Sequence, residues 1–547
     1  MTPKRQDRQP PWPAWILWLA LLAGIALWGR PAMPVDETRY LSVAWEMWLR
    51  GDFLVPFKNG EPYSHKPPLL FWLIHLGWWL AGVSDWWPRL ISPLLSLACA
   101  GLTWKLARCL WPEHPATARL APLVLISSLL WLLYSEALFF DILISLCALL
   151  GLLGLVQAAR TGELRWWGLF ALAIGLGGLA KGPAILVHLL PAALLAPWWR
   201  QPRWPQIHWP GWYARLGMAL VLGVALTLAW AIPAGQAGGE AYRNAIFWGQ
   251  TADRVVQSFA HRRPAWWYLA CLPLFLFPWL FWPRLLARLI RGLRSDWRDP
   301  GQRFVLVWFL GGLLIFSAIS GKQPHYLLPE MPAAALILGY ILARRPLSST
   351  PWLPGLALIL LGLGMGYLAL APLDFQDSEL LAKYLSPWAG AGFIVAGLLA
   401  LAPAPDPEAR VRRLAGTSLM AVLWLLIAVI RPFSAAYDVG PMARELARQE
   451  AMGRPIVIAG RYHAQFQFAG RLKAPLATVP EAQLPDWLRA HPDGVAVLTL
   501  TGEENAAPYH PLFTSPYRSG SLILVDRRAG AALAAHAPSG SGGDGED

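Results

Sequence analysis

Long apolar runs are the feature that most limits what this chain can fold into. A helix needs about 20 apolar residues to cross the hydrocarbon core of a bilayer. About thirteen runs approach this length, and most charged residues lie in the short segments between them. The runs are residues 14–29, 88–109, 118–134, 137–157, 166–181, 182–199, 213–233, 265–283, 304–320, 325–343, 354–373, 386–403 and 414–431. With 56% hydrophobic residues, the sequence predicts an all-α polytopic membrane protein.

Charged loops decide how a further run, residues 69–82, is placed. If this run does not cross, the basic segments 203–209, 284–303, 343–345 and 408–413 all lie on the side of the N-terminus. Six arginines fall within 284–303, and short basic loops are retained in the cytoplasm. We therefore predict that 69–82 is a partly embedded interfacial helix and that the N-terminus is cytoplasmic. The first run is expected to be an uncleaved anchor, because no small-residue cleavage pattern follows it.

The net charge of +13 does not indicate a nucleic-acid partner. The basic residues form short clusters between apolar runs, as in cytoplasmic loops of membrane proteins. The four cysteines all lie within or at the ends of apolar runs, so no disulfide framework is expected.

Hydrophobicity falls after residue 431, and the chain divides there. Residues 1–431 are predicted to form the transmembrane domain, in which 30–87 is the first periplasmic loop with its juxtamembrane helices. Residues 432–528 alternate helix-like stretches with short apolar strands, which predicts a small periplasmic α/β domain. Residues 529–547 are small, Gly/Ser-rich and acidic at the end, which predicts a disordered tail.

The first periplasmic loop opens with an acidic pair, Asp36 and Glu37, followed by Arg39 and Tyr40. On a helix, separations of three and four residues bring Asp36, Arg39 and Tyr40 onto one face. A carboxylate held in this way can act as a general base or orient an acceptor. The alternative is an acidic helix start that complements the helix dipole.

The same loop closes with Tyr63, His65 and Lys66, directly before the interfacial helix. At this depth an ammonium could meet a lipid phosphate, although snorkelling to the interface is an equally good explanation. His65 and His261 could together bind a divalent metal such as zinc.

Other ionisable residues converge on the same outer side of the membrane. Asp141 begins an apolar run and needs a partner, for which Lys181 is the candidate, as a structural ion pair or as a substrate contact. Arg262 lies outside, against the usual bias, and so favours an anionic ligand. A tight outer turn carries Lys322 and Tyr326.

Nucleotide-binding motifs are absent from the sequence, so no nucleotide cofactor is expected. An enzyme on this face would need an activated donor carried by a lipid. Lys66, Arg262 and Lys322 beside an embedded helix are the groups that a polyprenyl phosphate requires.

Five short motifs, in their order along the chain, resemble those of the lipid A aminoarabinose transferases of Gram-negative bacteria. They are Asp-Glu-x-Arg-Tyr, Tyr-x-x-Lys-Pro, Ala-Lys-Gly, His-Arg-x-Pro-x-Trp-Tyr and Gly-Lys-x-Pro-x-Tyr. These transferases belong to the C-type (GT-C), lipid-phosphate-dependent glycosyltransferases, which include the protein O-mannosyltransferases. The resemblance extends to about residue 345.

This resemblance implies that Asp36 is the catalytic carboxylate, with Arg39 and Tyr40 beside it. Tyr63, Lys66, Arg262 and Tyr326 would bind undecaprenyl phosphate, and Glu37, Asp141 and Lys181 would line the cavity. His65 stands where the family often has Glu near a metal. The implied partners are a polyprenyl-phosphate sugar donor, a lipid or glycan acceptor and membrane lipids, with the protein acting as a monomer.

The sequence thus predicts an inner-membrane glycosyltransferase that moves a sugar, such as 4-amino-4-deoxy-L-arabinose, from undecaprenyl phosphate to an acceptor such as lipid A. A transporter or flippase of anionic polyprenyl lipids is the main alternative, but it predicts charges near the membrane midplane and repeated halves. A protein O-glycosyltransferase and an O-antigen ligase or polymerase also stay open.

Overall fold

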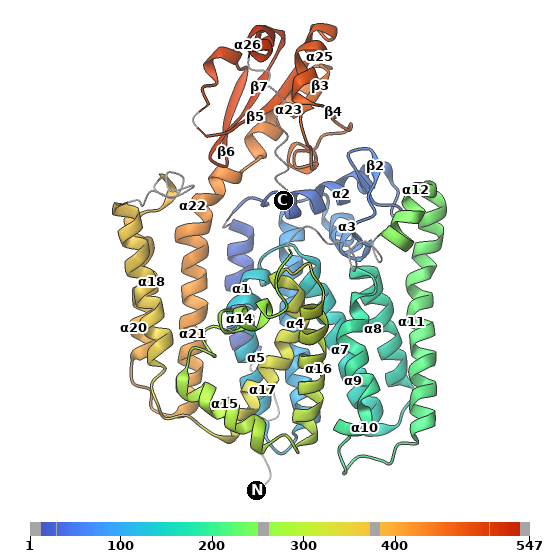
Figure 1. The fold of residues 1–547 in the computed structure, drawn as a ribbon, viewed down its shortest axis with the longest axis vertical. Helices are drawn as coiled ribbons and strands as arrows, with labels where there is room; N and C mark the ends of the chain where they lie inside the picture. The colour runs from blue at the N-terminus through green and yellow to red at the C-terminus, as the bar shows by residue number, and fades with distance from the viewer. Residues whose placement is uncertain (1–11, 29, 250–261, 372–382, 503, 536–547) are drawn as a thin grey trace.

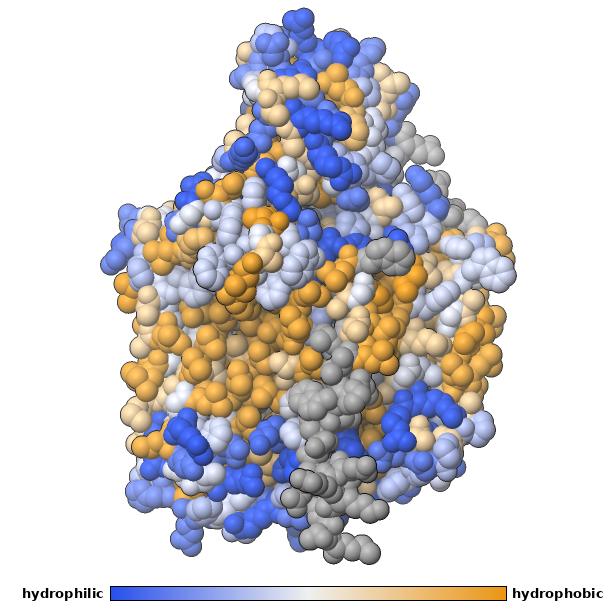
Figure 2. All heavy atoms as spheres, turned by 180° about the vertical axis from the view of Figure 1, so that it is seen from behind, coloured by the Kyte–Doolittle hydropathy of each residue, from blue (hydrophilic) through white to orange (hydrophobic). Residues whose placement is uncertain are grey.

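A computed structural model describes residues 12–28, 30–249, 262–371, 383–502 and 504–535. A bundle of helices carries a smaller mixed domain at one end (Figure 1). We call this the domain end of the bundle and the opposite one the far end. On the face shown in Figure 2, apolar side chains form a band across the bundle between two polar zones, as a bilayer requires.

Within the described residues, seven helical segments are long and apolar enough to cross a membrane, or eight if one bent pair is a single span. These segments contain α4 (Trp86–Leu110), α7 (Phe140–Thr161), α11 (Trp209–Ala237), α16 (Pro300–Ala318), α17 (Met331–Arg344), α18 (Trp352–Leu370) and α21 (Pro407–Leu425). Helix α7 is largely buried and lies at the centre of the core.

Shorter helices complete the bundle. They are α1 (Trp12–Trp28), α5 (Pro115–Ile126), α6 (Leu129–Ser135), α8 (Arg165–Lys181), α9 (Ala184–Leu194), α10 (Ala196–Trp199), α12 (Gly239–Asn244), α14 (Trp267–Phe275), α15 (Pro283–Ser295), α20 (Ala391–Leu401) and α22 (Arg431–Ser434). Two segments are π-helical, η2 (Ala245–Gly249) and η5 (Leu426–Ile430), and three are 3-10 helices, η3 (Pro324–Glu330), η4 (Pro387–Gly390) and η6 (Ala435–Tyr437).

Several predicted spans are not single helices. The run at 118–134 forms α5 and α6, which are bent by 65°. Ser127 and Ser128 lie at the bend, and their hydroxyls donate to the carbonyls of Leu123 and Val124, 2.6 and 2.7 Å away. The run at 265–283 contains the nine residues of α14 and ends at Pro283, where α15 begins. The sequence count assumed unbroken helices, so the figure of thirteen stays a prediction.

Two helices lie at the domain end before the chain enters α4. Helix α2 (Asp36–Arg50) leads to a hairpin of β1 (Phe57–Lys58) and β2 (Glu61–Pro62), and α3 (Leu69–Ala81) follows. With 13 residues, α3 is about 20 Å long, short of the roughly 30 Å core of a bilayer. It lies beside α2 (Figure 1), and its interfacial position, predicted for 69–82, stays a prediction.

The C-terminal domain is built on a five-stranded sheet. The strand order is β4-β3-β5-β7-β6, in which β3 pairs in parallel with β4 and β5, and β7 pairs antiparallel with β5 and β6. Alternate strand residues point to opposite faces, so two apolar clusters form, one on each side. The elements are α23 (Gly440–Ala451), β3 (Ile456–Ala459), α24 (Gln467–Gly470), β4 (Ala477–Val479), η7 (Glu481–Gln483), α25 (Leu484–Ala490), β5 (Val495–Leu500), η8 (Ala507–Tyr509), β6 (Phe513–Tyr517), β7 (Gly520–Val525), η9 (Arg527–Ala529) and α26 (Gly530–Ala535).

The predicted disordered tail begins too early. Residues 530–535 form α26, and Leu533 is buried against the sheet. Their small side chains suggested a flexible segment, but Ala and Leu also favour a helix once a surface is available. Residues 536–547 lie outside the described residues.

The C-terminal domain docks on the loop before α4. The Phe468 ring of α24 stacks on Trp78 of α3, with centroids 5.3 Å apart and planes 9° apart. Trp45 Nε1 of α2 donates to the carbonyl of Leu472 over 2.8 Å. Asn59, in the hairpin turn, donates to the carbonyl of Leu476 and accepts from its amide. The domain is therefore attached to both α2 and the hairpin.

Candidate active site

The first turn of α2 forms the carboxylate cluster that its spacing predicts. Asp36 Oδ1 accepts hydrogen bonds from Arg39 Nη2 and, over 3.3 Å, from the Tyr40 hydroxyl. Burial raises the pKa of Tyr40 well above its usual value, and the negative charge of Asp36 raises it further. The phenol therefore stays protonated and can donate. The Asp36 side chain is 42% exposed, so it is accessible to a substrate.

Glu37 points away from this cluster and into a separate buried network. Arg30 forms a two-pronged ion pair with Glu37 and also bonds Glu136 over 3.2 Å. The amides of Met33 and Leu138 each donate to Glu37 over 2.8 Å. Burial alone would raise the pKa of Glu37, but the Arg30 charge and these hydrogen bonds lower it. Glu37 thus holds the chain between α1 and α2, whereas the sequence placed it in the cavity.

Replacing Glu136 by Gln should stabilise the protein at pH 7 and change little at pH 4.5. Burial and the Glu37 charge raise the pKa of Glu136 to about 6, against the opposing effect of Arg30. The pKa of Glu136 is near 4.5 in the unfolded chain and about 6 in the folded protein. Between these two pH values the folded protein binds more protons, so the free energy of unfolding falls by about 2 kcal/mol as the pH rises. Unfolding midpoints in detergent from pH 4.5 to 7.5 check this, and an equal pH dependence of the wild type and the Glu136→Gln variant would contradict it.

Glu37→Gln is the contrasting variant. It should destabilise the protein by about 3–5 kcal/mol, because it leaves Arg30 poorly paired.

A second cluster lies at the junction of α7 and α8. Lys181, the last residue of α8, pairs with Asp141 in the first turn of α7. The Lys181 ammonium also lies 4.7 Å from the ring centroid of Tyr326. The structure thus brings together Asp141, Lys181 and Tyr326, three of the site residues predicted from the sequence.

His325 connects this cluster with the others. The charges of Asp141, Lys181, Lys66 and Asp36 all act on its imidazole. Its Nδ1 is 3.4 Å from the hydroxyl of Tyr134, on α6. The two carboxylates and two lysines predicted from distant segments therefore all lie near enough to influence the charge of one imidazole.

Phe140 joins the two halves of the site. Its ring packs edge-on against Tyr40, with centroids 5.1 Å apart, and the Lys66 ammonium lies 5.7 Å from its centroid. Tyr63 is buried and its ring lies 5.3 Å from that of His65. The end of the first loop therefore returns to the helix that carries Asp36.

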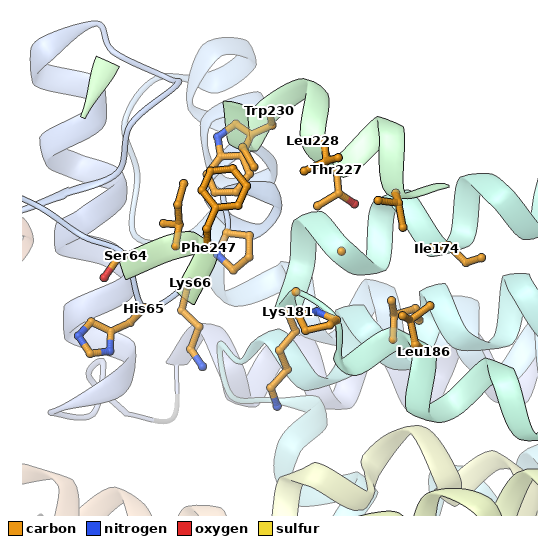
Figure 3. Close-up of a pocket in the computed structure, with 18 residues that line it drawn as sticks. Ser64, His65, Lys66, Ile174, Lys181, Leu186, Thr227, Leu228, Trp230 and Phe247 are labelled. Carbon is orange, nitrogen blue, oxygen red and sulfur yellow. The ribbon is translucent and has the colours of Figure 1, made fainter. Parts of the chain in front are cut away.

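A cavity of about 290 Å³ opens beside these residues. Lys66 and Lys181 come from different segments and extend next to one another at one end of it (Figure 3). Most other lining residues are apolar, and they come mainly from α8, α9, α11 and η2. They include Ile174, Leu186, Val224, Leu228, Trp230 and Phe247. The cavity thus combines two cations at one end with a long apolar wall, which suits a phosphorylated lipid.

Lys322 and Arg262 are placed differently. The Lys322 ammonium is buried and donates to the backbone carbonyls of Arg263, over 3.0 Å, and Ile319. It therefore joins the turn before η3 to the segment before α14, a structural use that the sequence did not predict. Arg262 pairs with Gly321 through its backbone, and its side chain is exposed.

The predicted metal site cannot be assembled from the described residues. His261 lies outside them, and the described part of the chain contains no group of three His, Cys, Asp or Glu side chains that could hold an ion. The metal at His65 stays a prediction, and no step below depends on it.

Sequence reasoning missed Arg30 and Phe140. Arg30 follows the first apolar run, where an arginine usually indicates an interface anchor. Phe140 sits in an apolar run and has no distinguishing signal. A buried pair at membrane depth, His188 Nδ1 and Glu330 Oε1 at 2.6 Å, was also missed, because each residue stands alone in an apolar stretch.

Known proteins resemble this chain in sequence and in fold. A family model described as dolichyl-phosphate-mannose-protein mannosyltransferase matches residues 65–230. An undecaprenyl phosphate-alpha-4-amino-4-deoxy-L-arabinose arabinosyl transferase from Pectobacterium atrosepticum is 32% identical over 387 residues, 66% of each chain. The chain thus spans just under two thirds of that relative. A transferase of the same name from Pseudomonas paraeruginosa is 28% identical over 541 residues, which cover 90% of this chain and 93% of the relative.

The fold has a solved counterpart. The crystal structure of ArnT from Cupriavidus metallidurans bound to undecaprenyl phosphate matches with a TM-score of 0.72 at 17% identity, covering 93% of this chain and 97% of that one. The fold is thus shared with this solved protein, and residues 65–230 carry the sequence pattern of the mannosyltransferase family model. Among the relatives, the chain is similar along most of its length to the undecaprenyl phosphate-alpha-4-amino-4-deoxy-L-arabinose arabinosyl transferases.

Proposed function

We propose that the protein transfers 4-amino-4-deoxy-L-arabinose from undecaprenyl phosphate to lipid A. The observation that carries this proposal is the cavity, in which Lys66 and Lys181 lie at the end of an apolar wall. A phosphate at the lysines and a polyprenyl tail along the wall would place the sugar near Asp36. The names of the relatives supply the sugar and the carrier.

Charge neutralisation is the main catalytic contribution in this proposal. The bond between the sugar's anomeric carbon and the phosphate oxygen breaks, and a bond to the acceptor oxygen forms. Lys66 and Lys181 stabilise the negative charge that grows on the departing phosphate. Asp36 accepts the proton of an acceptor hydroxyl, whereas a phosphate acceptor is already ionised and is only oriented. Arg39 and Tyr40 hold the Asp36 carboxylate in place.

The proposal places the site and the C-terminal domain in the periplasm. Basic segments gather at the far end, where Arg288 donates to the carbonyl of Arg345 and Arg410 to that of Leu347. Arginines in short loops favour the cytoplasmic side. Labelling of single cysteines introduced in the C-terminal domain, at exposed Arg489 for example, should succeed in cells with a membrane-impermeant reagent.

A direct assay tests the activity. The purified protein is reconstituted with lipid A and undecaprenyl phosphate carrying a labelled sugar. Labelled lipid A and free undecaprenyl phosphate should appear in equal amounts by mass spectrometry. Movement of the intact donor across the vesicle without either product would favour a flippase instead.

The cavity wall provides a second test. Leu228→Trp on α11 should raise the KM for the donor roughly tenfold with little change in kcat, because the indole displaces about two buried methylene groups of the tail. Val221→Trp is the matched control, since Val221 lies on the same helix, is 68% exposed and does not line the cavity. Equal KM values for both variants would contradict a tail along this wall.

The predicted divalent metal, such as zinc, is a separate part of the proposal. His65 lines the cavity beside Lys66 and would be one ligand, with His261 as another. Metal analysis of purified wild-type protein and of His65→Ala tests it. An equal metal content in both would remove His65 as a ligand.

A further inference from the structure

Helix α15 lies across the far end of the bundle (Figure 1). The burial of its residues divides it into three faces. Leu285 and Gly292 are buried, and Leu289 packs against the core. Residues three, four and seven apart share one side of a helix, so these positions form the side that faces the protein. The other two faces remain uncovered in the described structure.

One uncovered face is apolar. Leu286, Ile290 and Leu293 are between 36% and 48% exposed, and Trp297 extends the row just beyond the helix at 45%. Spacings of four, three and four residues place them in one stripe. A bundle that spans a bilayer has lipid along its sides, so the membrane itself is the natural cover of this stripe.

The third face is basic. Arg284, Arg291, Arg294 and Arg298 are exposed, and their spacing places them beside the apolar stripe, away from the protein. Within the described part of the chain, none of these four forms an ion pair with an acidic side chain. Arg345, by contrast, is paired with Asp296 over 3.1 Å. The four arginines thus carry positive charge that the described structure leaves uncompensated.

A cavity of about 300 Å³ adjoins the start of this face. Its lining combines Arg284 with the hydroxyl residues Ser348, Ser349 and Thr350. Trp282 and Trp352 flank it, and Trp282 Nε1 donates to Ser349 Oγ over 3.3 Å. A guanidinium with hydroxyls between two indoles is suited to a phosphate at the level of lipid headgroups.

We propose that α15 and this cavity bind acidic phospholipids of the leaflet opposite the C-terminal domain. The apolar stripe enters the acyl region, the arginine face meets the anionic headgroups, and the Arg284 cavity takes one phosphate. This site is at the other end of the bundle from the Lys66–Lys181 cavity and does not depend on the proposed transferase activity. The occupant is a lipid, because the apolar stripe and the cations lie side by side on one helix.

Native mass spectrometry of the full-length protein tests the proposal. The detergent-purified protein is titrated with phosphatidylglycerol and with phosphatidylcholine of the same acyl chains. The wild type should bind phosphatidylglycerol at least tenfold more tightly. Each arginine near a membrane surface contributes roughly fivefold to such a preference, so Arg291→Gln/Arg294→Gln/Arg298→Gln should remove most of it. Arg284→Gln should selectively weaken the tightest-bound phosphatidylglycerol.

A matched variant controls for total charge. Arg444→Gln/Arg489→Gln/Arg527→Gln removes three exposed arginines from the C-terminal domain and should keep the full preference. Elution volume and the unfolding midpoint in detergent report that both triple variants are folded. The proposal is overturned if the wild type does not distinguish the two lipids, or if the α15 variant keeps the preference. It is also overturned if millimolar glycerol phosphate displaces the lipid, since the site would then be one for a soluble phosphate.

Discussion

Asp36→Asn is expected to lower the rate of sugar transfer by about 100- to 10,000-fold, the range for loss of a general acid or base. The asparagine keeps the size of the side chain and can still accept from Arg39 and Tyr40. It cannot take a proton or present a full negative charge to the acceptor. The initial rate of labelled-sugar transfer to lipid A at saturating donor measures the effect.

The fold should be unaffected by this change. The ion pair of Asp36 with Arg39 is partly exposed, and such pairs contribute about 0–1 kcal/mol. Glu61→Gln, on exposed strand β2 of the same loop, is the matched control and should keep wild-type activity. Wild-type activity in the Asp36→Asn protein would remove this carboxylate from the mechanism.

Lys181→Met should have the second large effect, because it changes both stability and transfer. The substitution leaves Asp141 buried without its cation, and loss of one partner of a buried pair costs about 3–5 kcal/mol. It also removes one of the two ammonium groups at the end of the cavity. The unfolding midpoint in detergent and the transfer rate should therefore both fall.

The double variant Lys181→Met/Asp141→Asn separates these two effects. A neutral amide is much less costly to bury than an unpaired carboxylate, so the midpoint should return most of the way to that of the wild type. Transfer should stay low, because the phosphate still lacks its cation. Recovery of activity together with stability would show that the pair is structural and that Lys66 serves the phosphate without it.

Local helix geometry explains why part of the site was predictable from sequence. Asp36, Arg39 and Tyr40 are close in the chain, so the period of one helix is enough to bring them together. The pairing of Asp141 with Lys181 was predictable for another reason. A charge in an apolar run must find a partner, and only a few candidates share its side of the membrane.

Other features depend on packing between distant segments. Glu37 follows Asp36 directly, yet a step of one residue turns it to another side of α2, where Arg30 binds it. Lys322 resembles a phosphate ligand in sequence, but the neighbouring segment supplies carbonyls that occupy its ammonium. Breaks within apolar runs, such as that at Ser127 and Ser128, do not change hydropathy and so were not visible.

The C-terminal domain contacts two parts of the first loop that carry or adjoin residues of the site. Trp45 lies on the helix that begins with Asp36, and Asn59 lies a few residues before Lys66. Both are fastened to the same short stretch, from Leu472 to Leu476. These contacts with the C-terminal domain therefore help to fix the distance between the Asp36 carboxylate and the Lys66 ammonium. Exchanging this domain between relatives should alter turnover even though none of its described side chains lines the cavity.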